Sequence, residues 1–318
     1  MPHLLSIAEA HSYQLGYRWN PAKCVVINAS GMGHATPLTL YNQPIPTADS
    51  FSYLGIPFNN GTRVDPYLLI QRNTSSTIAA MRTLETLGCN PRGLPRLLAI
   101  RLYQQFIRPK MEYGLAITPS TKGQLKKLEQ AQDQCLRWIF GGHSKSSTKA
   151  FRHMANLPTM QDRVTNLGAK FLVRAFSLPD DALLPIMKPL ISNSHVHLWH
   201  KLTTTNTIWS HLPPPPQEAD RRTLKTTIKK MRLDRFMEMR DDPHSGVMLS
   251  FLRLTLTLDP ILFLPMTARE RSRLLRWRMG WLPGKPTAYK PDGANLGAQY
   301  LQWLRTDHPP SSTSSADA

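Results

Sequence analysis

The segment TKGQLKKLEQAQDQCLRWIFGG, residues 121–142, decides the expected fold because it carries a complete set of helix signals. Thr121 and Gln124 have the spacing of a capping box, in which each side chain satisfies a backbone N–H group at the start of a helix. Gly141 and Gly142 follow the last apolar positions and end the helix. The apolar positions fall on adjoining helical faces, at Leu125, Leu128, Cys135 and Ile139. The segment therefore predicts one long helix with a buried face.

Helical patterns continue on both sides of this segment. Asp65, which precedes a proline, suits the N-cap of a helix that Gly88 ends near residue 87. A second helix begins at about Leu94, and we expect Pro109 to break or kink it at Arg108. Further helical patterns cover about 148–156, 160–178, the residues after Asp180, and 218–240. The middle of the chain is therefore expected to be helical.

The first 58 residues show a different pattern. Residues 4–15 suit a helix, and the apolar, β-branched run 24–27 suits a short buried strand. Residues 38–41 and 51–56 alternate between apolar and polar side chains and are separated by turn residues, so we expect a small antiparallel sheet. The fold class is therefore α+β, a small antiparallel region followed by a mainly helical body and a basic, partly disordered C-terminal region.

The charge of the chain indicates a polyanionic partner. Lys and Arg total 39 against 21 Asp and Glu, a net charge of +18, and this positive charge is spread along the whole chain. Such a charge favours nucleic acid first and an anionic membrane second. We expect RNA, DNA or an RNA–DNA hybrid as the partner and no membrane contact.

The cysteines and the hydropathy pattern exclude other classes of protein. The three cysteines lie far apart and form no C-x-x-C pair, which excludes a cysteine-built zinc module or a disulfide framework. No window approaches the roughly 18 consecutive apolar residues of a membrane span, and the N-terminus has no signal-peptide pattern. We expect an intracellular protein, nuclear or cytoplasmic, that is not secreted.

Three ordered stretches carry a resemblance to a known family. They are GYRWNPAK at residues 16–23, FSYLG at 51–55 and LYQQFIRPKMEYG at 102–114. In this order and spacing they resemble the C-terminal half of reverse transcriptases from non-LTR, LINE-type retrotransposons. The resemblance covers roughly residues 4–175 and implies the end of the palm, the primer-grip hairpin and the helical thumb.

The resemblance also implies roles for single residues. Lys23 corresponds to a palm lysine that assists as a general acid in the parent enzyme, whose reaction is RNA-directed DNA synthesis with Mg²⁺. The primer-grip residues would be Phe51, Tyr53, Leu54 and Gly55. Without the resemblance, Lys23 is a solvated charge beside a turn, and Phe51 and Tyr53 are packing residues of an edge hairpin.

Polymerase chemistry needs clustered carboxylates that hold two divalent metal ions. The family places an aromatic-x-Asp-Asp hairpin just before the helix at residues 4–15, and this chain does not contain it. The pairs Asp180-Asp181 and Asp241-Asp242 lie in helix-boundary contexts and do not replace it. We therefore expect a truncated segment that is inactive as a polymerase alone, with no metal site and no cofactor of its own.

The helical and basic patterns, together with the resemblance, predict four regions. The palm, primer-grip and thumb names come from the resemblance. Residues 1–58 would be a palm remnant with the primer-grip hairpin, and 59–190 a helical thumb-like domain. Residues 191–305 would be a basic helical C-terminal region, and 306–318 a disordered tail rich in Ser and Pro.

Basic residues beside apolar ones are candidates for contacts to nucleic acid. The candidates are Arg101, Arg108, Lys110, Arg273, Arg276, Trp277 and Arg278, with Trp281 as a second stacking surface. Two structural alternatives stay open. Tyr103, Phe106 and Tyr113 fall on helical faces typical of packing, and residues 269–278 also suit a short helix with Leu274 and Leu275 inside.

His195, His197 and His200 raise the question of a metal site. No Cys, Asp or Glu lies between residues 182 and 217, so the histidines lack nearby ligands and a loop is favoured. Two alternatives to the truncated reverse-transcriptase segment also remain: a stand-alone basic helical protein that binds RNA or DNA, and a transposon relic without a selected function.

Overall fold

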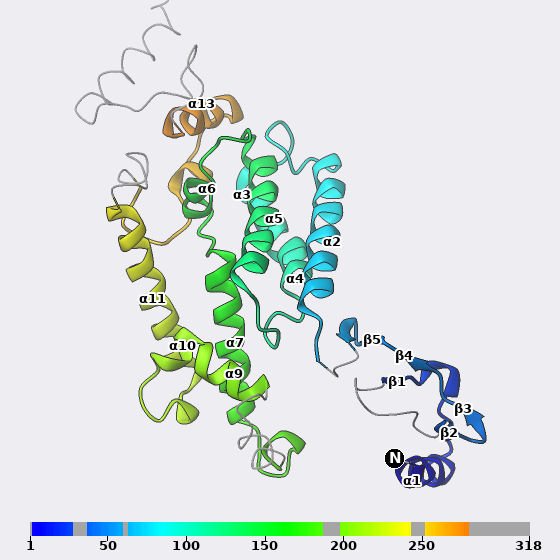
Figure 1. The fold of residues 1–318 in the computed structure, drawn as a ribbon. Helices are drawn as coiled ribbons and strands as arrows, with labels where there is room; N and C mark the ends of the chain where they lie inside the picture. The colour runs from blue at the N-terminus through cyan, green and yellow to red at the C-terminus, as the bar shows by residue number, and fades with distance from the viewer. Residues whose placement is uncertain (1, 28–36, 60–62, 187–197, 243–251, 280–318) are drawn as a thin grey trace, which may run out of the picture.

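The structure is a computed structural model that describes residues 2–27, 37–59, 63–186, 198–242 and 252–279. It is mostly helical, and the sheets among the described residues are two-stranded and lie in the first 59 residues (Figure 1). This agrees with the predicted α+β class. The tail at 306–318 and Trp281 lie outside the described residues.

The helical body, residues 65–176, is built where the sequence signals predict helices. Its α-helices are α2 (Pro66–Thr86), α3 (Arg96–Leu102), α4 (Arg108–Glu112), α5 (Lys122–Phe140), α6 (Thr148–Met154) and α7 (Met160–Phe176). The Asp65 carboxylate accepts hydrogen bonds from the first-turn N–H groups of α2, and the predicted capping box opens α5. Gly141 ends α5 in the left-handed conformation, with φ of 73°. These helix boundaries are confirmed.

We expected Pro109 to break or kink the helix at Arg108; the chain does not break there but remains helical through the proline. A π-helical segment, Tyr103–Ile107, joins α3 to α4. Proline has no N–H group, and its ring clashes with the carbonyl four residues earlier in a regular α-helix. The wider π turn, closed by the Arg108 N–H bond to the Tyr103 carbonyl, removes this conflict and lets the helix continue to Glu112.

The hydrophobic core of the body lies between α2, α5 and the α3–α4 helix, with α6 and α7 against α5 (Figure 1). Tyr103 is fully buried there, and its hydroxyl donates a hydrogen bond to Gln132. Phe106 is 58% exposed, so the expectation that it packs in the core is wrong; Tyr113 is 48% exposed and instead packs between regions, against the hairpin of residues 50–59. The π turn changes which side of this helix faces the core.

A charged network joins three helices of the body. Arg152 of α6 lies 2.6 Å from a Glu129 oxygen and 2.5 Å from an Asp133 oxygen of α5. The second oxygen of Glu129 accepts the N–H bond of Met160 at the start of α7. Burial raises the pKa of the Glu129 carboxyl, and Arg152 opposes this shift. The network fixes α6 and α7 on α5.

Further α-helices follow the body within the described ranges. The main ones are α9 (Leu198–Thr205), α10 (Thr207–Ser210), α11 (Arg221–Asp241) and α13 (Ala268–Arg278). α11 is the predicted basic helix, and it packs along α7. α13 begins with a capping box of Thr267 and Glu270 and buries Leu275, so the helical interpretation of residues 269–278 is confirmed.

The N-terminal unit, residues 2–59, differs from the expected single antiparallel sheet. After α1 (Pro2–Gln14) and a short 3₁₀ turn, three separate pairs of strands form. β1 (Val26–Ile27) pairs in parallel with β4 (Thr47–Ala48), and β2 (Thr39–Leu40) pairs antiparallel with β3 (Gln43–Pro44). Within the expected strand 24–27, the structure forms β1 at Val26–Ile27, and it is half-buried, not buried as expected.

Candidate nucleic-acid interface

The predicted primer-grip residues form a tight hairpin. β5 (Ser50–Tyr53) pairs antiparallel with β6 (Ile56–Asn59), so the predicted single strand 51–56 is wrong: a turn interrupts it at Leu54 and Gly55. Both turn residues have positive φ, 48° and 73°, the geometry that matches the twist of a two-residue hairpin. The turn carries a leucine where asparagine is preferred, which explains why the pattern did not reveal it.

The tip of this hairpin is attached to the helical body. The Tyr113 hydroxyl donates a hydrogen bond of 2.5 Å to the Leu54 carbonyl, and Arg72 of α2 donates to the Gly55 carbonyl. At the other end, the Asp65 N–H bonds the Pro57 carbonyl at 2.8 Å, just before α2 begins. Contacts at both ends therefore position the hairpin against the start of α2.

The hairpin presents its apolar tip to solvent. Tyr53 and Leu54 are 60% and 72% exposed. Phe51 is half-buried opposite Phe58, a cross-strand aromatic pair that stabilises the hairpin by roughly 0.2–1 kcal/mol. Phe51 therefore has the packing role, while Tyr53 and Leu54 remain available to a partner.

Aromatic and basic side chains continue this exposed surface onto the helical body. Tyr67, in the first turn of α2, is 55% exposed, and the Lys127 ammonium of α5 lies 4.9 Å from its ring centre. Tyr113 and Arg72, which bond the hairpin tip, are exposed as well. We name this group the hairpin surface; its members are Tyr53, Leu54, Tyr67, Arg72, Tyr113 and Lys127.

The sequence prediction missed four members of the hairpin surface, because it interpreted Tyr113 as a packing residue and did not single out Tyr67, Arg72 or Lys127. Tyr67 lies between the helix start at Asp65 and the buried residues Leu69 and Ile70. An aromatic residue outside the apolar repeat of a helix indicates an exposed ring, and this signal could have been used. Arg72 and Lys127 carry no such signal, because their partners are far away in sequence.

Lys23 lies in the N-terminal unit, exposed at the end of the 3₁₀ turn Pro21–Lys23. The side chain of Asn20 caps this turn by accepting the N–H bond of Ala22 at 3.0 Å. The following strand β1 pairs with β4, which immediately precedes the hairpin strand β5. The structure thus brings the segments of Lys23 and of the hairpin into one small unit.

The predicted thumb cations occupy different environments. Arg101 and Lys110 are exposed. Arg108 is largely buried, with its Nε 3.3 Å from a Glu112 oxygen, and burial lowers its pKa. Arg108 is therefore part of a charge cluster inside the body, unlike its two neighbours.

The C-terminal candidates also divide into two groups. Arg276 is exposed on α13, and Arg273 and Trp277 are partly buried. Arg278 bonds the buried Asp259 carboxylate at 2.8 Å, a pairing that neutralises its charge and weighs against a contact with phosphate. Fewer than the four predicted residues of this helix are therefore available for contacts with nucleic acid.

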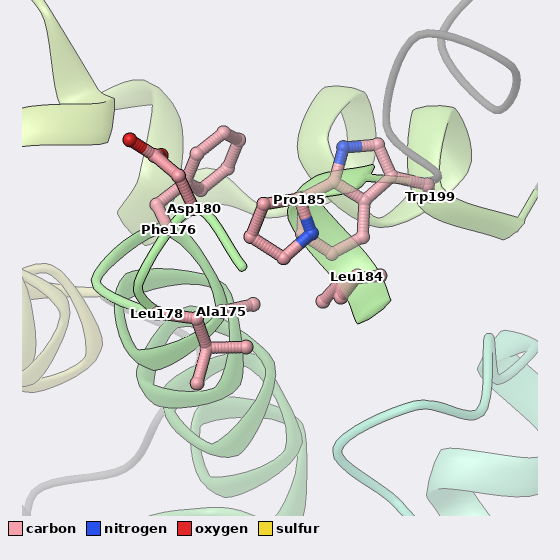
Figure 2. A pocket seen from close by; sticks show the side chains of 7 residues that line it. All are labelled: Ala175, Phe176, Leu178, Asp180, Leu184, Pro185 and Trp199. Carbon is pink, nitrogen blue, oxygen red and sulfur yellow. The ribbon is translucent and has the colours of Figure 1, made fainter. Parts of the chain in front are cut away.

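The described residues gather no metal-binding group. His200 lies in α9, but His195 and His197 fall outside the described ranges, and no group of three or more His, Cys, Asp or Glu side chains gathers within them. A pocket of about 90 Å³ lies beside α7, where Leu178, Leu184 and Trp199 line it and Asp180 is the one charged residue (Figure 2). Its volume is below that of ligand sites, about 300–1,000 Å³.

Within the described ranges, no helix combines the length and the apolar character needed to cross a membrane. Comparisons with protein-family models, with curated proteins and with solved structures found no match to this chain. The hairpin surface and the charges of the helices are therefore the basis for assigning a function.

Proposed function

We propose that this chain binds nucleic acid, an RNA–DNA hybrid or a single strand, through the hairpin surface. The observation that carries the proposal is the exposed hairpin tip, which two hydrogen bonds attach to the body, together with the exposed Tyr67–Lys127 pair at the start of α2, the helix that supplies one of these bonds. Aromatic rings stack on bases, and nearby cations contact phosphates, so the combination suits a sequence-tolerant site.

The resemblance to LINE-type reverse transcriptases gives this site a more specific interpretation. In that proposal residues 50–59 are the primer grip, α2 to α7 belong to the thumb, and Lys23 is the palm lysine. Two of the three stretches that carry the resemblance meet where the Tyr113 hydroxyl bonds the Leu54 carbonyl, which supports the interpretation. Residues 1–318 contain no aromatic-x-Asp-Asp segment, so binding is the activity that we propose for them.

The test is titration of the full chain with a labelled RNA–DNA hybrid at several salt concentrations. Tyr53→Ala should lower the affinity roughly 5- to 150-fold, because base stacking on an aromatic ring is worth about 1–3 kcal/mol. Lys127→Gln should weaken binding and reduce the slope of log affinity against log salt by about 0.7–0.9, the loss of one phosphate contact.

Lys145→Gln is the matched control, since Lys145 is an exposed lysine beyond the opposite end of α5. It removes the same charge and should leave the slope unchanged. Equal weakening by Lys127→Gln and Lys145→Gln would show that net charge alone drives binding and would remove the assignment to the hairpin surface. A flat salt response of the unmodified chain would overturn the phosphate contacts altogether.

A further inference from the structure

The first part of α11, residues 221–233, is strongly basic. It contains six Lys or Arg and no Asp or Glu. The acidic residues of this helix begin at Asp234. None of the six cations belongs to the hairpin surface, so the proposed function leaves their charge without a role.

Four of these cations share one exposed face of the helix. Positions 221, 225 and 229 are four residues apart, close to one helical turn, and position 222 lies beside them. At about 100° per residue, the four positions fall within roughly 100° of the helix circumference and extend over about 12 Å of its axis. All four residues are exposed. We name this group the α11 stripe; its members are Arg221, Arg222, Lys225 and Lys229.

Another face of α11 holds the helix on its neighbours. Leu224 is 4% exposed, and Ile228 and Met231 are partly buried in the same apolar cluster, which also contains Trp209 and Leu212. This face contacts α7 and α10. The stripe is therefore presented to solvent by a helix whose apolar residues already have partners.

Within the described ranges, the ion pairs of α11 do not involve the stripe. Arg235 bonds the Asp162 carboxylate of α7. The other ion pair of this helix in those ranges joins Arg240 to Asp241, near its C-terminus. The carboxylate that is nearest to the stripe in sequence, Asp220, is the N-cap of α11 and accepts a first-turn N–H bond at 2.7 Å. The stripe therefore keeps its positive charge.

This placement of charge destabilises the helix itself. Cations near a helix N-terminus oppose the helix macrodipole, and the first turn of α11 contains Arg221 and Arg222. Like charges four residues apart on a helix also repel each other, as at Lys225 and Lys229. A polyanion bound along the stripe would remove both effects, so the arrangement favours such a partner.

We propose that the α11 stripe binds the phosphate backbone of a double-stranded nucleic acid. A row of cations on a helix contacts successive phosphates without reading the bases. The stripe has no aromatic member that could stack on unpaired bases, unlike the hairpin surface. An anionic membrane is disfavoured, because an interfacial helix inserts its apolar face into the lipid and the apolar face of α11 is packed against α7 and α10.

The stripe is separate from the hairpin surface. In Figure 1, α11 and the hairpin strand β5 lie on opposite sides of the helical body. The contacts between helices agree with this view, since α2 packs on α5, α5 on α7, and α7 on α11. A duplex can therefore bind at α11 whether or not the hairpin surface binds a strand, so the site does not rest on the proposed function.

The experiment titrates the full chain with a short, blunt-ended DNA duplex at several salt concentrations. The double variant Lys225→Gln with Lys229→Gln should weaken duplex binding about 2- to 30-fold, as expected for the loss of two exposed charge contacts. It should also reduce the slope of log affinity against log salt by about 1.8, because each phosphate contact contributes about 0.9. Its melting temperature should not fall, since the substitutions remove a repulsion between like charges. Binding is then compared between folded proteins.

Arg92→Gln with Lys145→Gln is the matched control, because both residues are exposed and the pair removes the same charge. This control and Tyr53→Ala should leave duplex affinity nearly unchanged, since an intact duplex offers no unpaired bases to the hairpin surface. Equal weakening by the two double variants, or an unchanged salt slope in the α11 variant, would overturn the site. Vesicles of phosphatidylserine and phosphatidylcholine test the other polyanion: if the α11 variant loses vesicle binding but keeps its duplex affinity, the partner is a membrane and the proposal fails.

Discussion

The helical body and the N-terminal unit of this chain are stabilised in different ways. The body buries a continuous apolar core between its helices, with Leu69, Leu128 and Leu136 fully inaccessible. In the N-terminal unit, Leu40 and Tyr41 are the buried hydrophobic residues among those described, while Leu4 and Leu15 of the first helix segment are 62% and 64% exposed. Apolar burial, worth about 25 cal/mol per Å², therefore stabilises the body far more than the unit before it.

Polar contacts around Tyr41 provide part of the stabilisation of the N-terminal unit. Its hydroxyl lies 2.5 Å from the Ser12 Oγ and accepts the N–H bond of Trp19, and Arg18 lies over its ring. The remaining support comes from the body, through the bonds of Arg72 and Tyr113 to the hairpin tip. The comparison indicates that the unit depends on the body, whereas the body can form without the unit.

The largest expected effect tests whether the two regions share one core. Leu136→Ala should lower the free energy of unfolding by about 2–5 kcal/mol, because it leaves a cavity among fully buried neighbours. Leu40→Ala, at a position 3% exposed, should leave the main unfolding transition nearly unchanged. Urea denaturation followed by circular dichroism measures both, and equal shifts would mean that the regions unfold together.

The attachment of the hairpin should produce a smaller effect. Tyr113→Phe removes one hydrogen bond to the Leu54 carbonyl, worth about 0.5–1.5 kcal/mol. Faster amide hydrogen exchange is expected in residues 50–59 and in the preceding strands, with little change in α5. Unchanged exchange in the hairpin would show that it is held without the body.

Tyr41→Phe tests the polar contacts inside the N-terminal unit. Loss of the hydroxyl removes its contacts with Ser12 and the Trp19 N–H, and local stability should fall by roughly 1 kcal/mol. Hydrogen exchange of the Trp19 amide should accelerate while that of the body stays constant. Acceleration throughout α2 and α5 would contradict the independence of the body.

The smallest expected effect is a dependence of the body on pH. Burial lowers the pKa of His153, whose Nε2 lies 2.9 Å from the Arg253 carbonyl. The unfolded chain therefore binds a proton on His153 at a higher pH than the folded chain does. The stability of the folded state that depends on neutral His153 is complete above about pH 6.5 and is lost as the pH falls toward the folded-state pKa. Melting temperatures between pH 7 and pH 5 should fall less in His153→Gln than in the unmodified chain.

The buried Glu129 acts in the opposite sense, because its raised pKa favours the folded state as the pH falls. Glu129 is present both in the unmodified chain and in His153→Gln, so its contribution cancels when the pH dependences of the two proteins are compared. An identical pH dependence in both proteins would show that His153 does not contribute.

The contrast between the regions also explains how far the sequence predicted the structure. Local signals such as Asp65, Thr121 and Gly141 located the helices of the body, because caps act on neighbouring backbone groups. The parallel pairing of β1 with β4 and the contact of Tyr113 with Leu54 depend on residues far apart in the chain. Patterns of period 2 or 3.6 contain no information about such contacts.

The same limit applies to the candidate sites. Tyr53 and Leu54 were predicted by resemblance and are exposed at the hairpin tip. Arg108 was predicted as a phosphate contact, but the Glu112 carboxylate that it shares with Arg163 could be found only from the packing of α4 and α7.

The π turn before Arg108 has a consequence for insertions and deletions. Removing one residue from Tyr103–Ile107 would restore a regular α-helix and rotate everything that follows by about 100°. Glu112 would turn away from Arg163, and Tyr113 would turn away from the hairpin tip. The single extra residue therefore sets the rotational phase of α4 for the hairpin surface and for the Glu112–Arg163 ion pair at once, so length changes are tolerated far less here than substitutions.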